Sequence, residues 1–146
     1  MFLISHRGNT NGINKDEENQ IDYIKSAINK GFDVEIDVRT YKNKLYLGHD
    51  TPEVLIDDEF LKNNKLWCHA KDLNALNKLN KIKSHFFWHQ EDDVTITNKG
   101  FFWTYPGKQL FKKSICVLPE KASYKKFKCF GICSDYIVKY KKKLNK

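Results

Sequence analysis

Residues 32–38 read FDVEIDV, and apolar and acidic side chains alternate along them without a break. This alternation predicts a β-strand with its valines and isoleucine on one face and its carboxylates on the other, because side chains two residues apart share a face. The acidic row is explained by a solvent-facing strand edge. The alternative is a parallel barrel, whose polar side chains gather at the carboxyl ends of the strands. There, Glu35 and Asp37 would be oxygen ligands suited to Mg²⁺ or Ca²⁺.

Short apolar runs and helical patterns alternate on both sides of this strand. Strands are predicted at residues 2–4, 45–47, 66–68, 86–88, 101–103, 115–117 and 130–133, helices at 17–30, 72–82 and 136–144, and helical turns at 108–111 and 121–127. Strands alternating with helices indicate parallel pairing and an α/β fold. Seven or eight strands favour a compact (β/α) TIM-type barrel formed by one domain, residues 1–146. Because an ordinary barrel of this type has about 250 residues, we expect several outer helices to be shortened or missing. The apolar faces left uncovered would favour a homo-oligomer.

The composition narrows the functional class. The net charge of +8 favours acidic partners, but the lysines are spread along the chain apart from one dense cluster, Lys139 to Lys146. That cluster is typical of a solvated helix end, and without an aromatic and basic platform we expect no nucleic-acid binding. No apolar stretch approaches the roughly 20 residues of a transmembrane segment, and the N-terminal residues lack the apolar region of a signal peptide. The four cysteines form no C-x-x-C pair and are expected as buried reduced thiols, so we expect a cytoplasmic protein.

Further polar residues follow the predicted strands. His6 and Arg7 follow the first strand and His49 follows the segment 45–47, so all three are expected at the same mouth of the barrel. Arginine binds phosphate through its planar fork of donors, and imidazole titrates near neutral pH. A lone histidine is more often structural than catalytic, but this combination of histidines, arginine and carboxylates indicates a catalytic site.

Three sequence motifs carry a resemblance to a known family. The segments ISHRGN (4–9), GFDVEIDVRT (31–40) and LYLGHD (45–50), with the Glu18-Asn19 pair between the first two, contain the ordered pattern H-R, E-x-D, H-D. In this the chain resembles the glycerophosphodiester phosphodiesterase superfamily over residues 3–50. Weaker similarities are the segment 67–71, where the family has E-x-K, and the segment 131–135, which is similar to its last strand.

The resemblance implies a (β/α) barrel that hydrolyses a phosphodiester with one divalent cation, Mg²⁺ or Ca²⁺, with Mn²⁺ as an alternative. The substrate would be a glycerophosphodiester or a phosphodiester linked to a glycan or lipid precursor. The roles that it implies are acid–base catalysis for His6 and His49, phosphate binding for Arg7 and Lys71, and metal binding for Glu35, Asp37 and His69.

The sequence departs from the family pattern in two places. His69 stands where the family has a glutamate, and a neutral nitrogen ligand would weaken Mg²⁺ binding and favour Mn²⁺ or another ion that accepts nitrogen. Alternatively, His69 is no ligand and water or substrate fills its place. Residues 51–65 are too few for the family's usual insertion, which favours an open mouth and a large substrate. Residues expected either to line the pocket or to serve only in the core or at helix starts are His89, Trp103, Tyr105, Glu120 and Asp135.

Other functions use the same residues. The site could belong to a phosphomonoesterase or to a lyase that forms a cyclic phosphate. A module that binds phosphorylated ligands without turnover is the third alternative, although His6, Arg7, Glu35, Asp37 and His49 are all retained.

Overall fold

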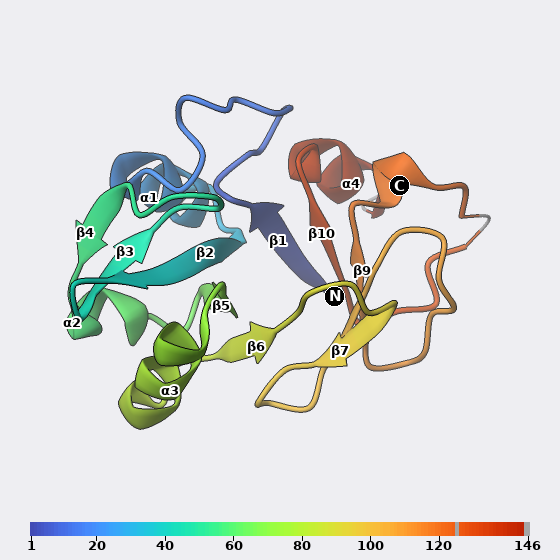
Figure 1. Cartoon of the computed structure of the whole chain (residues 1–146). Coiled ribbons are helices and arrows are strands. Elements are labelled where there is room, and N and C mark those ends of the chain that lie inside the picture. Colours follow the sequence, from blue (N-terminus) through green and yellow to red (C-terminus); the bar gives the residue numbers. More distant parts are fainter. Residues whose placement is uncertain (125, 145–146) are drawn as a thin grey trace.

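The computed structural model describes residues 1–124 and 126–144. Within these ranges, ten strands form one curled mixed sheet (Figure 1). The bounds of the strands are β1 Phe2–His6, β2 Asp33–Tyr41, β3 Lys44–Leu47, β4 Val54–Ile56, β5 Leu66–Ala70, β6 Phe86–Trp88, β7 Val94–Ile96, β8 Phe102–Thr104, β9 Ser114–Val117 and β10 Gly131–Ser134. The helices are α1 Ile21–Asn29, α2 Asp58–Leu61, α3 Leu73–Ile82 and α4 Ile137–Leu144, with a 3₁₀ turn at Pro119–Lys121.

The strands follow one another around the curl in the order β6-β5-β2-β1-β10-β9-β8-β7, and β3 and β4 extend β2 as an antiparallel hairpin. The neighbours from β6 to β8 pair in parallel, whereas β7 runs antiparallel to β8. The carboxyl ends of seven strands therefore meet at one end of the sheet, and this end carries the candidate site.

The expectation of a closed (β/α) barrel is wrong, because β6 and β7 form no strand pair in the described part of the chain. Residues 89–93 alone join them, and a parallel crossover needs a dozen residues or more. The chain therefore turns back, and a side chain bridges the gap in place of a ladder. The side-chain oxygen Oδ1 of Asn98 accepts a hydrogen bond from the Phe86 backbone amide at 2.9 Å. The backbone amide of Asn98 donates to the Phe86 carbonyl at 3.0 Å.

The alternation in β2 sorts the two sides of the sheet as predicted. Val34, Ile36 and Val38 are fully buried under α1 and α3 on the outside of the curl. The inside is filled below the site by an aromatic cluster that includes Trp67, Phe87 and Trp103. Asp33 at the start of β2 accepts a hydrogen bond from Trp67 below these rings, and the polar side chains of the candidate site lie above them, where the strands finish.

Most of the predicted elements are present, with shifted ends. The helix expected over 17–30 begins at Ile21, because residues 15–19 form turns. The sequence patterns missed β4, β7 and α2, each of three or four residues. No helical turn is found at 108–111. Of the turn expected at 121–127, residue 125 lies outside the described residues, as do residues 145–146 of the C-terminal lysine cluster.

The state of the cysteines agrees with the prediction of reduced thiols. Cys68, Cys116 and Cys133 are buried and Cys129 is half-buried, and all four are free. Among the described residues, no helix has the length and apolar character needed to span a bilayer.

Candidate active site

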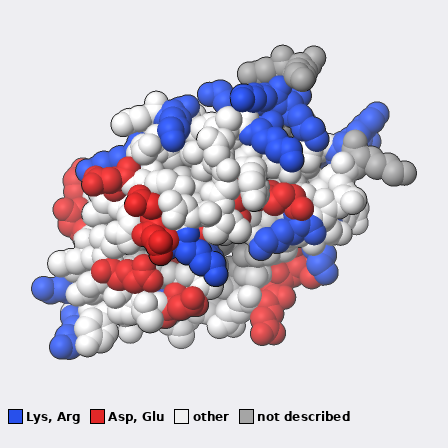
Figure 2. Space-filling view, turned by 90° about the horizontal axis from the view of Figure 1, so that it is seen from above, with Lys and Arg blue, Asp and Glu red and all other residues white. Residues whose placement is uncertain are grey.

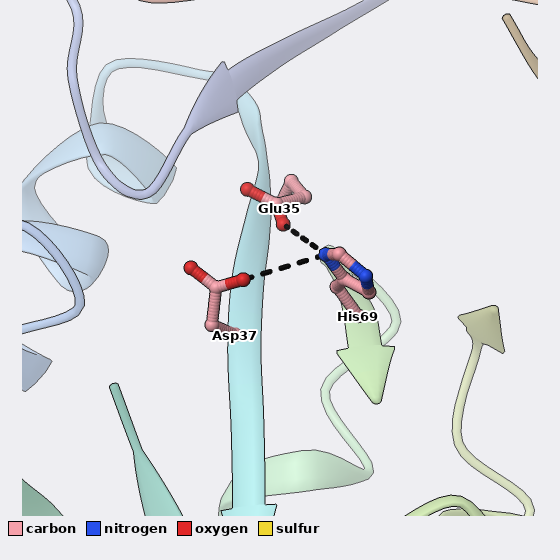
Figure 3. A group of neighbouring side chains, drawn as sticks. All are labelled: Glu35, Asp37 and His69. Atoms are coloured by element: carbon pink, nitrogen blue, oxygen red, sulfur yellow. Dashed lines mark ion pairs between the residues drawn. The ribbon is translucent and has the colours of Figure 1, made fainter. Parts of the chain in front are cut away.

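A buried group of three side chains lies where β2 and β5 pair. Glu35 and Asp37 come from alternate positions of β2, and His69 is the β5 residue in register with Asp37. Figure 3 shows the three side chains pointing toward one another, with His69 Nδ1 lying 3.8 Å from Glu35 Oε1 and 3.4 Å from Asp37 Oδ1. One ligand atom from each lies within 4.8 Å of the others, so this group could hold a metal ion.

One oxygen of each carboxylate has no hydrogen-bond partner among the described residues. Glu35 is 2% exposed and Asp37 is fully buried, yet Glu35 Oε2 and Asp37 Oδ1 accept no hydrogen bond from any described residue. A buried polar atom without a partner costs free energy, about 1–3 kcal/mol and more when charged. Both carboxylates therefore have an oxygen that is free to bind a cation, and oxygen and imidazole donors in this number suit a divalent one.

Neighbouring residues hold Asp37 in place through its second carboxylate oxygen, Oδ2, and its backbone amide. Asn19 donates from Nδ2 to Asp37 Oδ2 at 3.0 Å, and its Oδ1 accepts from the Asp37 amide at the same distance. Arg7 Nε lies 2.9 Å from the same oxygen, Oδ2. This clamp leaves Asp37 Oδ1 turned toward His69 and fixes the carboxylate in the orientation that a metal ligand needs.

The electrostatic surroundings act in opposite directions on the two carboxyl groups. Burial and the charge of Asp37 raise the pKa of Glu35 above its ordinary value. Burial alone would raise the pKa of Asp37 too, but contacts with His69, Arg7 and Lys71 hold it well below its usual range. Asp37 is thus the more readily ionised of the two, and a bound cation would stabilise the charge on Glu35 as well.

The second element of the site is a histidine–aspartate pair. His6 ends β1, and its Nδ1 lies 2.7 Å from Asp135 Oδ1 at the end of β10. Burial would lower the pKa of His6, but the hydrogen bond with Asp135 and the charges of Glu35 and Asp135 outweigh it and raise the pKa. Because a carboxylate only accepts, Nδ1 carries the hydrogen and Nε2 is the free ring nitrogen, 3.8 Å from Glu35 Oε2.

Asp135 is itself positioned by its neighbours. Its Oδ1 also accepts from Asn9 Nδ2 at 2.8 Å, and its backbone amide donates to Glu120 Oε1 at 3.0 Å. Glu120 accepts from Ser134 as well and is not among the cavity-lining residues, so its carboxylate holds the end of β10. The network fixes the orientation of the His6 ring.

An open cavity of about 560 Å³ lies over these groups. Of the residues predicted for the site, the cavity is lined by His6, Arg7, Glu35, His49, His69, Lys71, His89, Trp103, Tyr105 and Asp135. Lining residues that the sequence patterns did not indicate include Ile13, Lys15, Trp88 and Lys121.

The remaining predicted residues differ in how they are held. Arg7 also donates from Nη1 to Glu18 at 3.1 Å, and Lys71 Nζ lies 3.7 Å from Asp37 Oδ1, so both cations are anchored beside the acidic group. His49 lies at the rim with 40% of its side chain exposed, and its Nδ1 contacts Asp50 at 2.8 Å. Its backbone carbonyl accepts two hydrogen bonds from Arg39, which fixes the loop.

Aromatic residues also line the cavity. His89 stacks on Tyr105 with ring centroids 3.8 Å apart, whereas Trp103 is 2% exposed and belongs mainly to the core. Another cavity of about 590 Å³, beside α3, is lined mostly by lysine and asparagine, and its lining includes no histidine and no buried carboxylate. The cavity over Glu35 is therefore the candidate active site.

Charge is mixed on the face shown in Figure 2. Acidic and basic side chains are interspersed there, and the last turn of α4 carries Lys141, Lys142 and Lys143. These lysines are exposed, as predicted for a solvated helix end.

Comparison with known proteins gives no match: no family model fits the chain, and no curated protein or solved structure is significantly similar to it. The functional argument therefore depends on the site itself.

Proposed function

We propose that the protein is a metal-dependent phosphodiesterase of the glycerophosphodiester phosphodiesterase type. One observation carries the proposal: the buried side chains of Glu35, Asp37 and His69 converge beneath an open cavity that is also lined by His6, Arg7 and Lys71, and one oxygen of each carboxylate has no hydrogen-bond partner among the described residues. A phosphodiester needs a positive site for its non-bridging oxygens and groups that move protons at its ester oxygens.

The cations would bind and orient the phosphate. Arg7 uses Nε and Nη1 for contacts with Asp37 and Glu18, and Nη2 makes no hydrogen bond with a described residue. Lys71 lies on the other side of Asp37, so a phosphate over the acidic group would contact both side chains. A divalent ion bound by Glu35, Asp37 and His69 would polarise the phosphoryl group and counter its charge.

The histidines would move the protons. His6 in its neutral form accepts a proton at Nε2, while Asp135 holds Nδ1 and stabilises the imidazolium that results. His49 at the rim would donate a proton to the leaving oxygen, with Asp50 as its partner. A hydroxyl next to the ester is one nucleophile that His6 could activate, giving a cyclic phosphate that water then opens.

The test is hydrolysis of bis(p-nitrophenyl) phosphate and glycerophosphocholine with Mg²⁺, Ca²⁺ or Mn²⁺. The expected result is turnover that requires a metal and falls by at least about 100-fold in His6→Gln and in Glu35→Gln. His85→Gln is the matched control, since His85 is a buried histidine that does not line the cavity and should leave turnover unchanged.

The products separate the alternative functions. A phosphodiesterase releases a monoester, a phosphomonoesterase acts on monoesters to give inorganic phosphate, and a lyase stops at the cyclic diester. Binding of phosphorylated ligands with no turnover under any divalent metal would contradict the proposal and favour a binding module.

A further inference from the structure

The orientation of His69 identifies the nitrogen that faces the carboxylates. His69 Nε2 lies 3.2 Å from the backbone carbonyl oxygen of His89. A carbonyl oxygen only accepts, so Nε2 carries a hydrogen. The ring also stacks on Phe87, with centroids 4.8 Å apart and planes 18° from parallel, which holds the ring plane, and a 180° flip would remove Nε2 from the His89 carbonyl. Nδ1 is therefore the nitrogen presented to Glu35 and Asp37 (Figure 3).

A neutral imidazole in this orientation turns a lone pair toward two acidic side chains. The nearest oxygen of each lies at 3.4 and 3.8 Å from Nδ1. Lone pairs placed in this way repel unless a proton or a cation lies between them. The separations are close to those of neighbouring ligands on one ion, ~3–3.5 Å for metal–ligand bonds of about 2.1 Å.

The second contact of His69 is of the kind that metal-binding histidines make. Such histidines usually donate from the other ring nitrogen to a carbonyl or carboxylate, which fixes the tautomer. The His89 loop that supplies the carbonyl is itself fixed, because the His89 ring stacks on Tyr105 and its Nε2 lies 2.6 Å from the Asp92 carbonyl.

We infer that His69 binds the cation through Nδ1 and that the site consequently selects Mn²⁺ or Zn²⁺ over Mg²⁺ and Ca²⁺. The inference rests on the proposed function only in taking Glu35, Asp37 and His69 as the cation site. Mg²⁺ and Ca²⁺ are hard ions that prefer oxygen, whereas imidazole suits the first-row metals. The described metal-binding group contains two carboxylates, and Arg7 and Lys71 lie close to one of them, so the group has little net negative charge to hold a hard ion.

The test is metal binding, measured apart from turnover. Metal-free protein is titrated calorimetrically with Mn²⁺, Zn²⁺, Mg²⁺ and Ca²⁺, using the wild type, His69→Gln, His69→Glu and the control His85→Gln. Wild type and control should bind Mn²⁺ and Zn²⁺ at least ~10-fold more tightly than Mg²⁺. His69→Gln should lose at least ~10-fold in Mn²⁺ and Zn²⁺ affinity, and His69→Glu should reduce the preference for Mn²⁺ over Mg²⁺.

A spectroscopic measurement on the wild type tests whether a nitrogen atom binds the metal, and its result does not depend on the folding of a variant. Electron spin echo of the Mn²⁺ complex should show ¹⁴N coupling in the wild type and in His85→Gln, and none in His69→Glu. Absence of ¹⁴N coupling in the wild type, or Mg²⁺ binding as tight as Mn²⁺ binding, would overturn the inference. Mg²⁺-supported turnover without nitrogen coupling contradicts only this inference, whereas nitrogen-ligated Mn²⁺ without hydrolysis of any phosphodiester contradicts only the proposed function.

Discussion

His85 makes the stability of the protein sensitive to acid. Its side chain is buried before β6, its Nε2 lies 3.0 Å from Thr97 Oγ1 across the gap between β6 and β7, and its ring packs against Trp67. Burial, with a smaller contribution from Lys99, lowers the pKa of His85 to about 3. The folded protein therefore keeps His85 neutral at pH values where the unfolded chain protonates it.

The size of the effect follows from proton linkage. The unfolded histidine has a pKa of about 6.5, so below this pH the unfolded state binds more protons and the free energy of unfolding falls as the pH is lowered. At about pH 5 this histidine is almost fully protonated in the unfolded chain and neutral in the folded one. The difference amounts to about 2 kcal/mol, and it grows until the pH reaches the folded pKa.

The assay is urea unfolding of the wild type and His85→Gln at pH 8 and pH 5. Glutamine can still contact Thr97 but does not titrate, so the loss of unfolding free energy between the two pH values should be about 2 kcal/mol smaller in the variant. Thr97→Val is the control, because it removes the hydrogen bond and retains the titrating ring. Equal losses in the wild type and His85→Gln would refute the reasoning.

Two further substitutions test how the site is positioned. Asp135→Asn removes a charge that raises the pKa of His6, so the acid limb of the pH profile of kcat/KM should move to lower pH. The rate should fall roughly 10²–10⁴-fold. An acid limb at the wild-type pH would contradict the pairing of His6 with Asp135. Gly48→Ala places a Cβ 1.9 Å from the Thr51 carbonyl oxygen at a φ of +144°, so unfolding free energy should fall by about 3 kcal/mol and the His49 loop should shift. An unchanged urea midpoint would show that this loop does not depend on the glycine.

The local patterns in the sequence account for most of the strands but not for the way in which the sheet ends. The alternation in residues 32–38 gives both the apolar outer face and the acidic inner face of β2. Strand β7 was missed because Val94–Ile96 is too short to show a period. The missing pairing between β6 and β7 could not be predicted either, because it depends on the short link 89–93 and on the hydrogen bonds of Asn98.

The site was predictable wherever strand direction alone brings residues together. Parallel pairing puts His6 beside Glu35, and Asp37 beside His69, in direct register. The partner of His6 is Asp135, 129 residues away, and no local pattern specifies that hydrogen bond. The role of Asn19 was also hidden, because the Glu18-Asn19 pair does not reveal which side chain would clamp Asp37.

The most direct test of the account follows the phosphorus of glycerophosphocholine by ³¹P NMR in the presence of metal-loaded wild type, chelator-treated wild type and Asp37→Asn. Asp37 is the buried carboxylate that Asn19 and Arg7 orient toward the candidate metal position. The account predicts that the diester signal is converted to a monoester signal by the metal-loaded wild type alone. A diester signal that persists with folded, metal-loaded wild type, or conversion that continues in Asp37→Asn, would contradict it.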